Sequence, residues 1–195
     1  MTGSIDRPVR LLNVMPTLMC GGTEGQMMTL CRSLDPRRFD LAFACLRKLG
    51  PFVKEIEEWP LPLTEYRFSS FLSAKALRRQ LTFARDVARQ RVDIVHAYSF
   101  YGNVFAVPPA RLARTPVVIA SIRDLGLYLT PLQKRVQRYA CRLADCVIVN
   151  AEAVKTWLVS EGYDAARIVV IHNGVNLARF SEPAQRRTPH RRATS

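Results

Sequence analysis

The sequence predicts one α/β domain of the Rossmann-like, doubly wound class, with a parallel sheet covered by helices on both faces. Short apolar runs alternate with helical patterns along almost the whole chain, which is typical of parallel strands joined by helices. The runs at 117–120 and 147–149 are continuously apolar, as expected of strands buried on both sides. With 195 residues, 48% of them hydrophobic, the chain is long enough to bury one such core.

The individual elements follow in order from the residue patterns. Apolar and β-branched runs predict strands at 9–15, 39–46, 63–68, 93–97, 117–122, 146–149 and 168–171. Apolar residues at spacings of three and four predict helices near 23–34, 71–91, 103–113, 131–143 and 151–161. The pattern stops at Phe180. Residues 181–195 hold prolines and arginines without apolar periodicity, so we expect a disordered basic tail there.

Hydropathy and cysteine usage indicate an intracellular protein without a structural metal. No apolar run approaches the roughly 20 residues that span a bilayer, and residues 1–10 lack the apolar stretch of a secretory signal. We therefore expect a cytoplasmic location. The five cysteines are odd in number and show no C-x-x-C spacing, which favours neither a disulfide framework nor a zinc site. We interpret them as small buried hydrophobic residues.

The net charge of +13 and the pI near 10.2 predict an acidic partner: nucleic acid, an anionic membrane surface or a phosphorylated small molecule. Much of the excess is arginine and lysine on two expected helices, where it equally suits a solvated face. These residues are Arg78, Arg79, Arg85, Arg89 and Arg91 on one helix, and Lys134, Arg135, Arg138 and Arg142 on the other.

A glycine-rich turn joins the first strand to the first helix. It contains Gly21 and Gly22, and Thr23 with Gln26 predicts a capping box at the start of the helix. Glycines let the backbone approach a ligand closely, and the free N–H groups at a helix N-terminus favour an anion. The alternative is a tight turn without a ligand.

This turn does not match a nicotinamide-binding site. Its spacing is not G-x-G-x-x-G, and the second strand ends at Arg47 and Lys48 rather than at an acidic residue that would hold a ribose.

Further polar residues follow the fourth and fifth expected strands. His96 ends one strand, and Ser121, Arg123 and Asp124 end the next. In open α/β sheets the carboxyl ends of the strands line the ligand crevice. His96 is therefore either a ligand for an acceptor hydroxyl or a core histidine. Arg123 suits a phosphate or carboxylate, or else contacts Asp124. We expect Asn103 to cap the following helix.

Several segments in order resemble the N-terminal domain of family 4 glycosyltransferases of the GT-B fold, over roughly residues 9 to 180. The glycine turn reads G-G-T-E at 21–24, and the fourth strand reads D-I-V-H at 93–96. The segment A-D-C-V-I-V-N-A-E at 144–152 is followed by I-H-N-G-V-N at 171–176 and by Phe180.

The resemblance implies roles for named residues in an interdomain cleft. Gly21 and Gly22 would bind the donor diphosphate, and Asn173 and Gly174 would begin the interdomain linker. The acceptor-binding residues would be Thr23, His96, Tyr98, Asn103 and Arg123. The sequence departs from the family in three places: Arg123 and Tyr98 stand where histidines are common, and His172 stands where proline is usual.

The resemblance also implies a retaining transferase that uses a nucleotide-sugar donor, a glycan, lipid or small-molecule acceptor, and no metal or other cofactor. The family's C-terminal donor domain, with its E-x7-E motif, is not in these residues, so we expect the fragment to be inactive alone or to work with a partner chain. The basic helices would then contact anionic lipid or a polyprenyl phosphate.

Two other functions are open at this point. One is an NADP-type Rossmann oxidoreductase fragment, in which Arg47 and Lys48 would hold the 2′-phosphate. The other is a basic module that binds nucleic acid, although no reader motif for bases is evident. The transferase hypothesis requires Gly21 and Gly22 to lie on the same rim of the sheet as His96 and Arg123.

Overall fold

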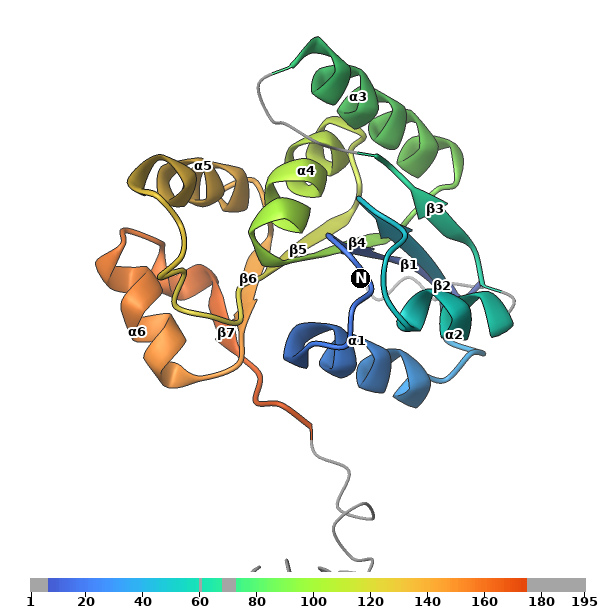
Figure 1. Cartoon of the computed structure of the whole chain (residues 1–195), viewed down its shortest axis with the longest axis horizontal. Helices are drawn as coiled ribbons and strands as arrows, with labels where there is room; N and C mark the ends of the chain where they lie inside the picture. Colours follow the sequence, from blue (N-terminus) through green and yellow to red (C-terminus); the bar gives the residue numbers. More distant parts are fainter. Residues whose placement is uncertain (1–6, 60, 68–72, 175–195) are drawn as a thin grey trace, which may run out of the picture.

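The computed structural model describes residues 7–59, 61–67 and 73–174. Its centre is a seven-stranded sheet in the order β3-β2-β1-β4-β5-β6-β7, with every neighbouring pair parallel (Figure 1). The strands are β1 (Val9–Met15), β2 (Phe39–Cys45), β3 (Leu63–Glu65), β4 (Ile94–Tyr98), β5 (Val117–Ser121), β6 (Cys146–Val149) and β7 (Ile168–Val170). The predicted fold class and all seven predicted strands are confirmed, with ends that differ by a few residues; the predicted end of the third strand, Phe68, lies outside the described residues.

Helices cover both faces of this sheet, but unequally. They are α1 (Gly22–Ser33), α2 (Phe52–Glu58), α3 (Ala74–Arg89), α4 (Ser99–Leu112), α5 (Pro131–Cys141) and α6 (Glu152–Ser160), with a 3-10 turn at Ala165–Arg167. One core joins α1 and α2 to β1, β2 and β4. The larger core lies on the other face, where α3, α4, α5 and α6 pack on the sheet (Figure 1). No helix in the described ranges has the length and apolar character needed to cross a bilayer.

The strand order places a topological switch between β1 and β4. The chain winds outward from β1 to β2 and β3, then returns across the sheet to β4 and continues in the other direction. Because all strands are parallel, their carboxyl ends form one edge, and a crevice at the switch point of that edge is where open α/β sheets bind ligands. Gly102 lets α4 lie close to β1 there, since a Cβ at this position would stand 3.1 Å from the Val14 carbonyl oxygen.

The start of α4 differs from the prediction. The helix begins at Ser99, directly after β4, and not at Asn103. Ser99 adopts a φ of 61°, a left-handed conformation that turns the chain from strand to helix without an intervening loop. Asn103 therefore lies inside the helix, and the prediction that it caps the helix is wrong.

Two short elements and two cysteine environments were also missed. The helix α2 and the 3-10 turn have no counterpart among the predicted elements. Cys20 is exposed and Cys146 is only partly buried, contrary to the expectation that every cysteine is buried, whereas Cys31, Cys45 and Cys141 are buried as expected. The expected tail at 181–195 lies outside the described residues.

Candidate functional site

The glycine turn opens onto the start of α1 at the carboxyl edge of the sheet. Gly21 is the N-cap, with extended backbone, and α1 begins at Gly22. Both glycines are exposed. A Cβ on Gly22 would meet no atom of the described residues within 4 Å, whereas one on Gly21 would collide with the Glu24 carboxylate. Gly22 thus presents open backbone at the positive end of a helix, an arrangement suited to an anion, whereas the Gly21 N–H already donates to the Met19 carbonyl at 3.1 Å.

The predicted capping box at this turn is wrong. Gly21 has no side chain that could cap, so Thr23 lies within the first turn of α1. The side-chain amide of Gln26 instead pairs with the backbone of Gly174 in both directions, donating to its carbonyl at 2.8 Å and accepting from its N–H at 2.9 Å. The start of α1 is therefore tied to the last described residue of the chain.

A buried row of polar side chains crosses three strands beneath the same edge. The Tyr98 hydroxyl lies 2.9 Å from His96 Nδ1 and 3.3 Å from Asn13 Oδ1, to which it donates. His96 Nε2 lies 2.8 Å from the Ser121 hydroxyl. The register explains the row, because Asn13 is paired with His96 and Tyr98 with Ser121. Residues from β1, β4 and β5 are thus joined by side-chain hydrogen bonds as well as by the sheet.

His96 is held neutral in this row. Its side chain is only 6% exposed, and burial, with the nearby Arg123 charge, lowers its pKa from 6.5 to about 3. Both ring nitrogens have hydrogen-bond partners, and the ring stacks on Tyr98 with centroids 4.1 Å apart. Of the two alternatives that the sequence left open for His96, this geometry matches the core histidine.

Asn103 is a second buried support of the edge. Its Nδ2 donates to the Ser121 carbonyl at 3.0 Å, which ties α4 to the end of β5. The side chain has no exposed surface, and its Oδ1 has no hydrogen-bond partner in the part of the chain that the structure describes. In this conformation Asn103 lies behind the surface that a ligand would touch.

Arg123 is the cation of the edge. It is half-buried, and desolvation lowers its pKa below the usual value. It donates to the side-chain oxygen of Asn173. The alternative contact with Asp124 is not the one formed, since Asp124 accepts from the Gly126 N–H at 2.7 Å and from the Tyr128 hydroxyl at 3.3 Å.

These contacts bring the glycine turn and Arg123 to the same rim. Gln26 reaches Gly174, and the neighbouring Asn173 reaches Arg123, so the segment that ends the described chain bridges them. His96 and Tyr98 lie close to Arg123, whose charge acts on the pKa of both. The geometric requirement of the transferase hypothesis is met.

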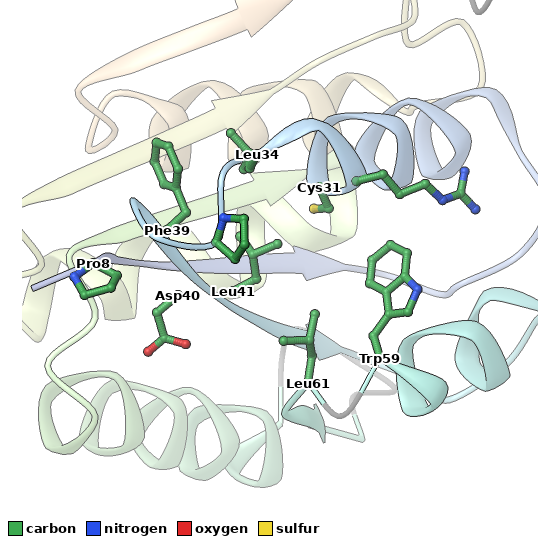
Figure 2. A pocket seen from close by; sticks show the side chains of 10 residues that line it. Pro8, Cys31, Leu34, Phe39, Asp40, Leu41, Trp59 and Leu61 are labelled. Carbon is green, nitrogen blue, oxygen red and sulfur yellow. The ribbon is translucent and has the colours of Figure 1, made fainter.

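An apolar cavity of about 760 Å³ lies elsewhere (Figure 2). It opens between α1, β2 and the end of α2, and Trp59, Leu61 and Cys31 line it. Pro8 and Phe39, at the starts of β1 and β2, also line it, so it lies toward the amino ends of the strands. This cavity is not part of the edge described above.

Lys48, one of the two residues that would hold a 2′-phosphate in an oxidoreductase, is otherwise engaged. The Lys48 ammonium contacts Glu57 at 3.0 Å, and the Lys48 N–H donates to the Glu65 carboxylate at 2.8 Å. An acidic side chain beside this position works against a second phosphate there. Within the described residues, no group of three His, Cys, Asp or Glu side chains is arranged to hold a metal ion.

Solved structures of twice the length share this fold. HepE of Anabaena, in complex with UDP and glucose, matches with a TM-score of 0.73 at 17% identity, covering 87% of this chain and 46% of that one. A glycosyltransferase from Rickettsia africae matches with a TM-score of 0.68 at 22% identity, covering 89% and 45%. MurG of Acinetobacter baumannii matches with a TM-score of 0.63 at 15% identity, covering 87% and 46%. The chain thus spans about half the length of these structures.

A search of the curated proteins found no match. The model of the family described as Glycosyltransferase Family 4 matches residues 20–179, which is most of the chain and includes the glycine turn, His96 and Arg123. The resemblance found in the sequence motifs is thereby confirmed, and the protein belongs to glycosyltransferase family 4.

Proposed function

We propose that this chain is the acceptor-side half of a retaining glycosyltransferase that takes its sugar from a nucleotide-sugar donor. The observation that carries the proposal is the shared rim of the glycine turn and Arg123 in a chain of this family. The neighbour structures with UDP and UDP-glucose support a nucleotide-sugar donor. The proposal includes no metal ion.

In this proposal the donor diphosphate lies against Gly21 and Gly22. The open space beside Gly22 admits phosphate oxygens to the N–H groups at the start of α1, and the helix dipole stabilises the negative charge that develops on the leaving diphosphate. Thr23 and Arg123 face the acceptor. His96, Tyr98 and Asn103 border this site from below, and their hydrogen bonds fix the strand ends that carry the surface residues.

A second domain or a partner chain would supply the rest of the donor site, so this chain alone would not transfer sugar. On the α1 side of the sheet, Val117, Val169 and Ile171 are exposed, although parallel sheets are normally covered on both faces. Their neighbours Ile168 and Val170 pack in the opposite core, as strand alternation requires. This apolar face supports a partner domain or partner chain that packs against β5, β6 and β7, with Asn173 and Gly174 leading toward it.

We propose that the protein binds peripherally to the inner face of the membrane and acts on a lipid-linked acceptor. The loop before α5 and its first turn expose Leu127, by 83% of its surface, together with Tyr128 and Leu132. Lys134 and Arg135 follow on the same helix. Exposed leucine and tyrosine beside basic residues suit the boundary between lipid tails and anionic headgroups.

The test is the binding of UDP to the ¹⁵N-labelled chain, measured through its amide chemical shifts. UDP at millimolar concentration should shift the amides of Gly21, Gly22 and Thr23. Gly22→Ala should weaken this binding by about fivefold or more, because a methyl group then stands where phosphate oxygens approach. The fold should survive, since that methyl meets no other atom within 4 Å.

Gly25→Ala is the matched control, because it adds the same methyl to the same helix, again with no atom within 4 Å, and it should leave UDP binding unchanged. Equal binding by wild type and Gly22→Ala, or no UDP-dependent shift at all, would contradict the diphosphate role. Saturation by micromolar NADPH with shifts at Arg47 and Lys48 would favour the oxidoreductase.

A further inference from the structure

A basic crevice lies between α5 and the turn that follows α6. Two adjoining cavities of about 410 and 250 Å³ share Arg138 as a wall. Among the described residues, five cations and two carboxylates line them: Lys134, Arg135, Arg138, Arg142 and Arg167, with Glu161 and Asp164. The crevice therefore carries an excess of positive charge.

Two of these guanidinium groups are fixed by neutral carbonyls. Arg138 Nη1 donates to the Glu161 carbonyl at 2.6 Å, and Arg167 donates to the carbonyls of Arg142, at 2.8 Å, and Ala144. A carbonyl orients a guanidinium without neutralising it, unlike a carboxylate. Arg138 is thus held in place with its charge still available to an anion, whereas the Arg167 charge also acts on the Asp145 carboxylate and helps to lower its pKa.

Arg138 also has an unused donor. Its Nε is buried and has no hydrogen-bond partner among the described residues, although an unsatisfied buried donor destabilises a folded protein. The turn after α6 is shaped around this side chain. Gly162 has a φ of 84°, and a Cβ there would stand 2.6 Å from Arg138 Nη1. Only glycine lets the guanidinium lie over the turn.

Nearby carboxylates leave much of this charge unopposed. Glu161 is paired with Lys134 at 3.0 Å, and the Lys134 ammonium also lies 5.2 Å from the Trp157 ring centroid. The Asp164 side chain accepts from the Ala166 N–H at 3.0 Å and so caps the 3-10 turn. Arg142 lies over the Tyr139 ring, 5.1 Å from its centroid, and remains exposed.

We infer that this crevice binds a phosphate group, with Arg138 at its centre and Arg142 at its mouth. A guanidinium offers paired donors that match two phosphate oxygens, and the oriented Arg138 and the exposed Arg142 supply the charge. The crevice lies beside the turn that leads into the start of β7, toward the edge of the sheet opposite the glycine turn. The inference therefore does not depend on the proposed transfer reaction. The phosphate is either free or part of a phospholipid headgroup.

The first arm of the test titrates inorganic phosphate into the folded chain and follows the Nε–Hε resonance of Arg138. Wild type should show a saturable shift. Arg138→Gln should weaken phosphate binding, measured by calorimetry, by about tenfold or more, as expected for loss of a charge-assisted pair. Arg89→Gln is the control: it removes the same charge from α3, where Arg89 is exposed and paired with Asp86, and it should leave binding unchanged.

The second arm separates the two phosphate sources with vesicles of phosphatidylcholine that contain or lack phosphatidylglycerol. A headgroup site requires that Arg138→Gln, but not Arg89→Gln, reduces binding to the anionic vesicles, and that free phosphate competes with them. If only free phosphate binding depends on Arg138, the ligand is a soluble phosphate.

If Arg138→Gln and Arg89→Gln weakened phosphate binding equally, the effect would come from net charge alone, and the proposed site would be overturned. An Arg138 resonance that does not shift when phosphate is added would also overturn it. Should Arg138→Gln not fold, Arg142→Gln replaces it. Arg142 is exposed, so its loss should weaken phosphate binding without unfolding the chain, and undiminished binding would overturn the inference.

Discussion

Mildly acidic solution should destabilise this domain, because His96 is buried in its neutral form. The folded protein holds the ring neutral, with its pKa lowered from 6.5 to about 3, because a charged imidazolium would be buried in the core. The unfolded chain binds a proton near pH 6.5. Since the unfolded state then binds more protons than the folded state, stability is complete above that pH and falls as the pH drops below it.

The size of the loss follows from the unfolded pKa, because the folded ring stays neutral throughout the window. Lowering the pH from about 7.5 to about 5 should cost roughly 2 kcal/mol, at 1.36 kcal/mol for each unit below the unfolded pKa. The carboxylates affect stability only at lower pH. Asp93 and Asp145 have pKa values lowered from 3.8, so their stabilisation is lost only below about pH 4.

The assay is urea unfolding at several pH values, with wild type compared to His96→Gln. The variant should start from lower stability, because Tyr98 and Ser121 lose a partner, but should lose about 2 kcal/mol less than wild type over the same pH range. His172→Gln removes an exposed histidine and should keep the steep loss. Parallel pH curves for wild type and His96→Gln would refute the reasoning.

Two further pairs of substitutions test local geometry by thermal or urea unfolding. Gly50→Ala should lower the free energy of unfolding by about 2–4 kcal/mol, because Gly50 has a φ of 116° and its new Cβ would collide with the Leu18 backbone. Gly25→Ala lies inside α1 with open space around the new Cβ, so it should instead raise the free energy of unfolding by up to about 1 kcal/mol. Equal effects of the two substitutions would contradict the strained turn at Gly50. Thr130→Ala should cost about 1 kcal/mol, because Thr130 forms the capping box of α5. Thr23→Ala should cost less than half of that, since Thr23 is not a cap, and the reverse order would restore the capping box predicted there.

The sheet could be predicted because each strand is visible in its own local sequence pattern. β1, β5 and β6 are runs of apolar residues that are buried on at least one face. The helix that escaped prediction, α2, has only 7 residues, which is shorter than the window over which helical periodicity is read. The start of α4 escaped for a different reason: most of its residues are buried, which leaves no polar face to mark the helix.

The partners of the site residues could not be predicted, because they depend on strand order. His96 meets Ser121 and Tyr98 meets Asn13 only because β4 lies between β1 and β5. One signal was available in the sequence: Asn13 is a polar residue in the middle of the apolar first strand. The contact of Gln26 with Gly174, 148 residues apart in the chain, left no such signal.

The buried polar row is itself an argument for function at this edge. The face of the sheet that carries Asn13, His96, Tyr98 and Ser121 is elsewhere filled by residues such as Leu11 and Met15, and an apolar core would satisfy the fold without the cost of desolvating hydroxyl, amide and imidazole groups.

The row lies at the switch point, close to Arg123 and behind the glycine turn. A neutral, fully bonded histidine adds no positive charge beside Arg123, whose guanidinium is, among the described residues, the cation that acts on the pKa of His96 and Tyr98. Replacing the row by apolar side chains should therefore leave a folded sheet and impair the site, which distinguishes residues that position a site from residues that only fill a core.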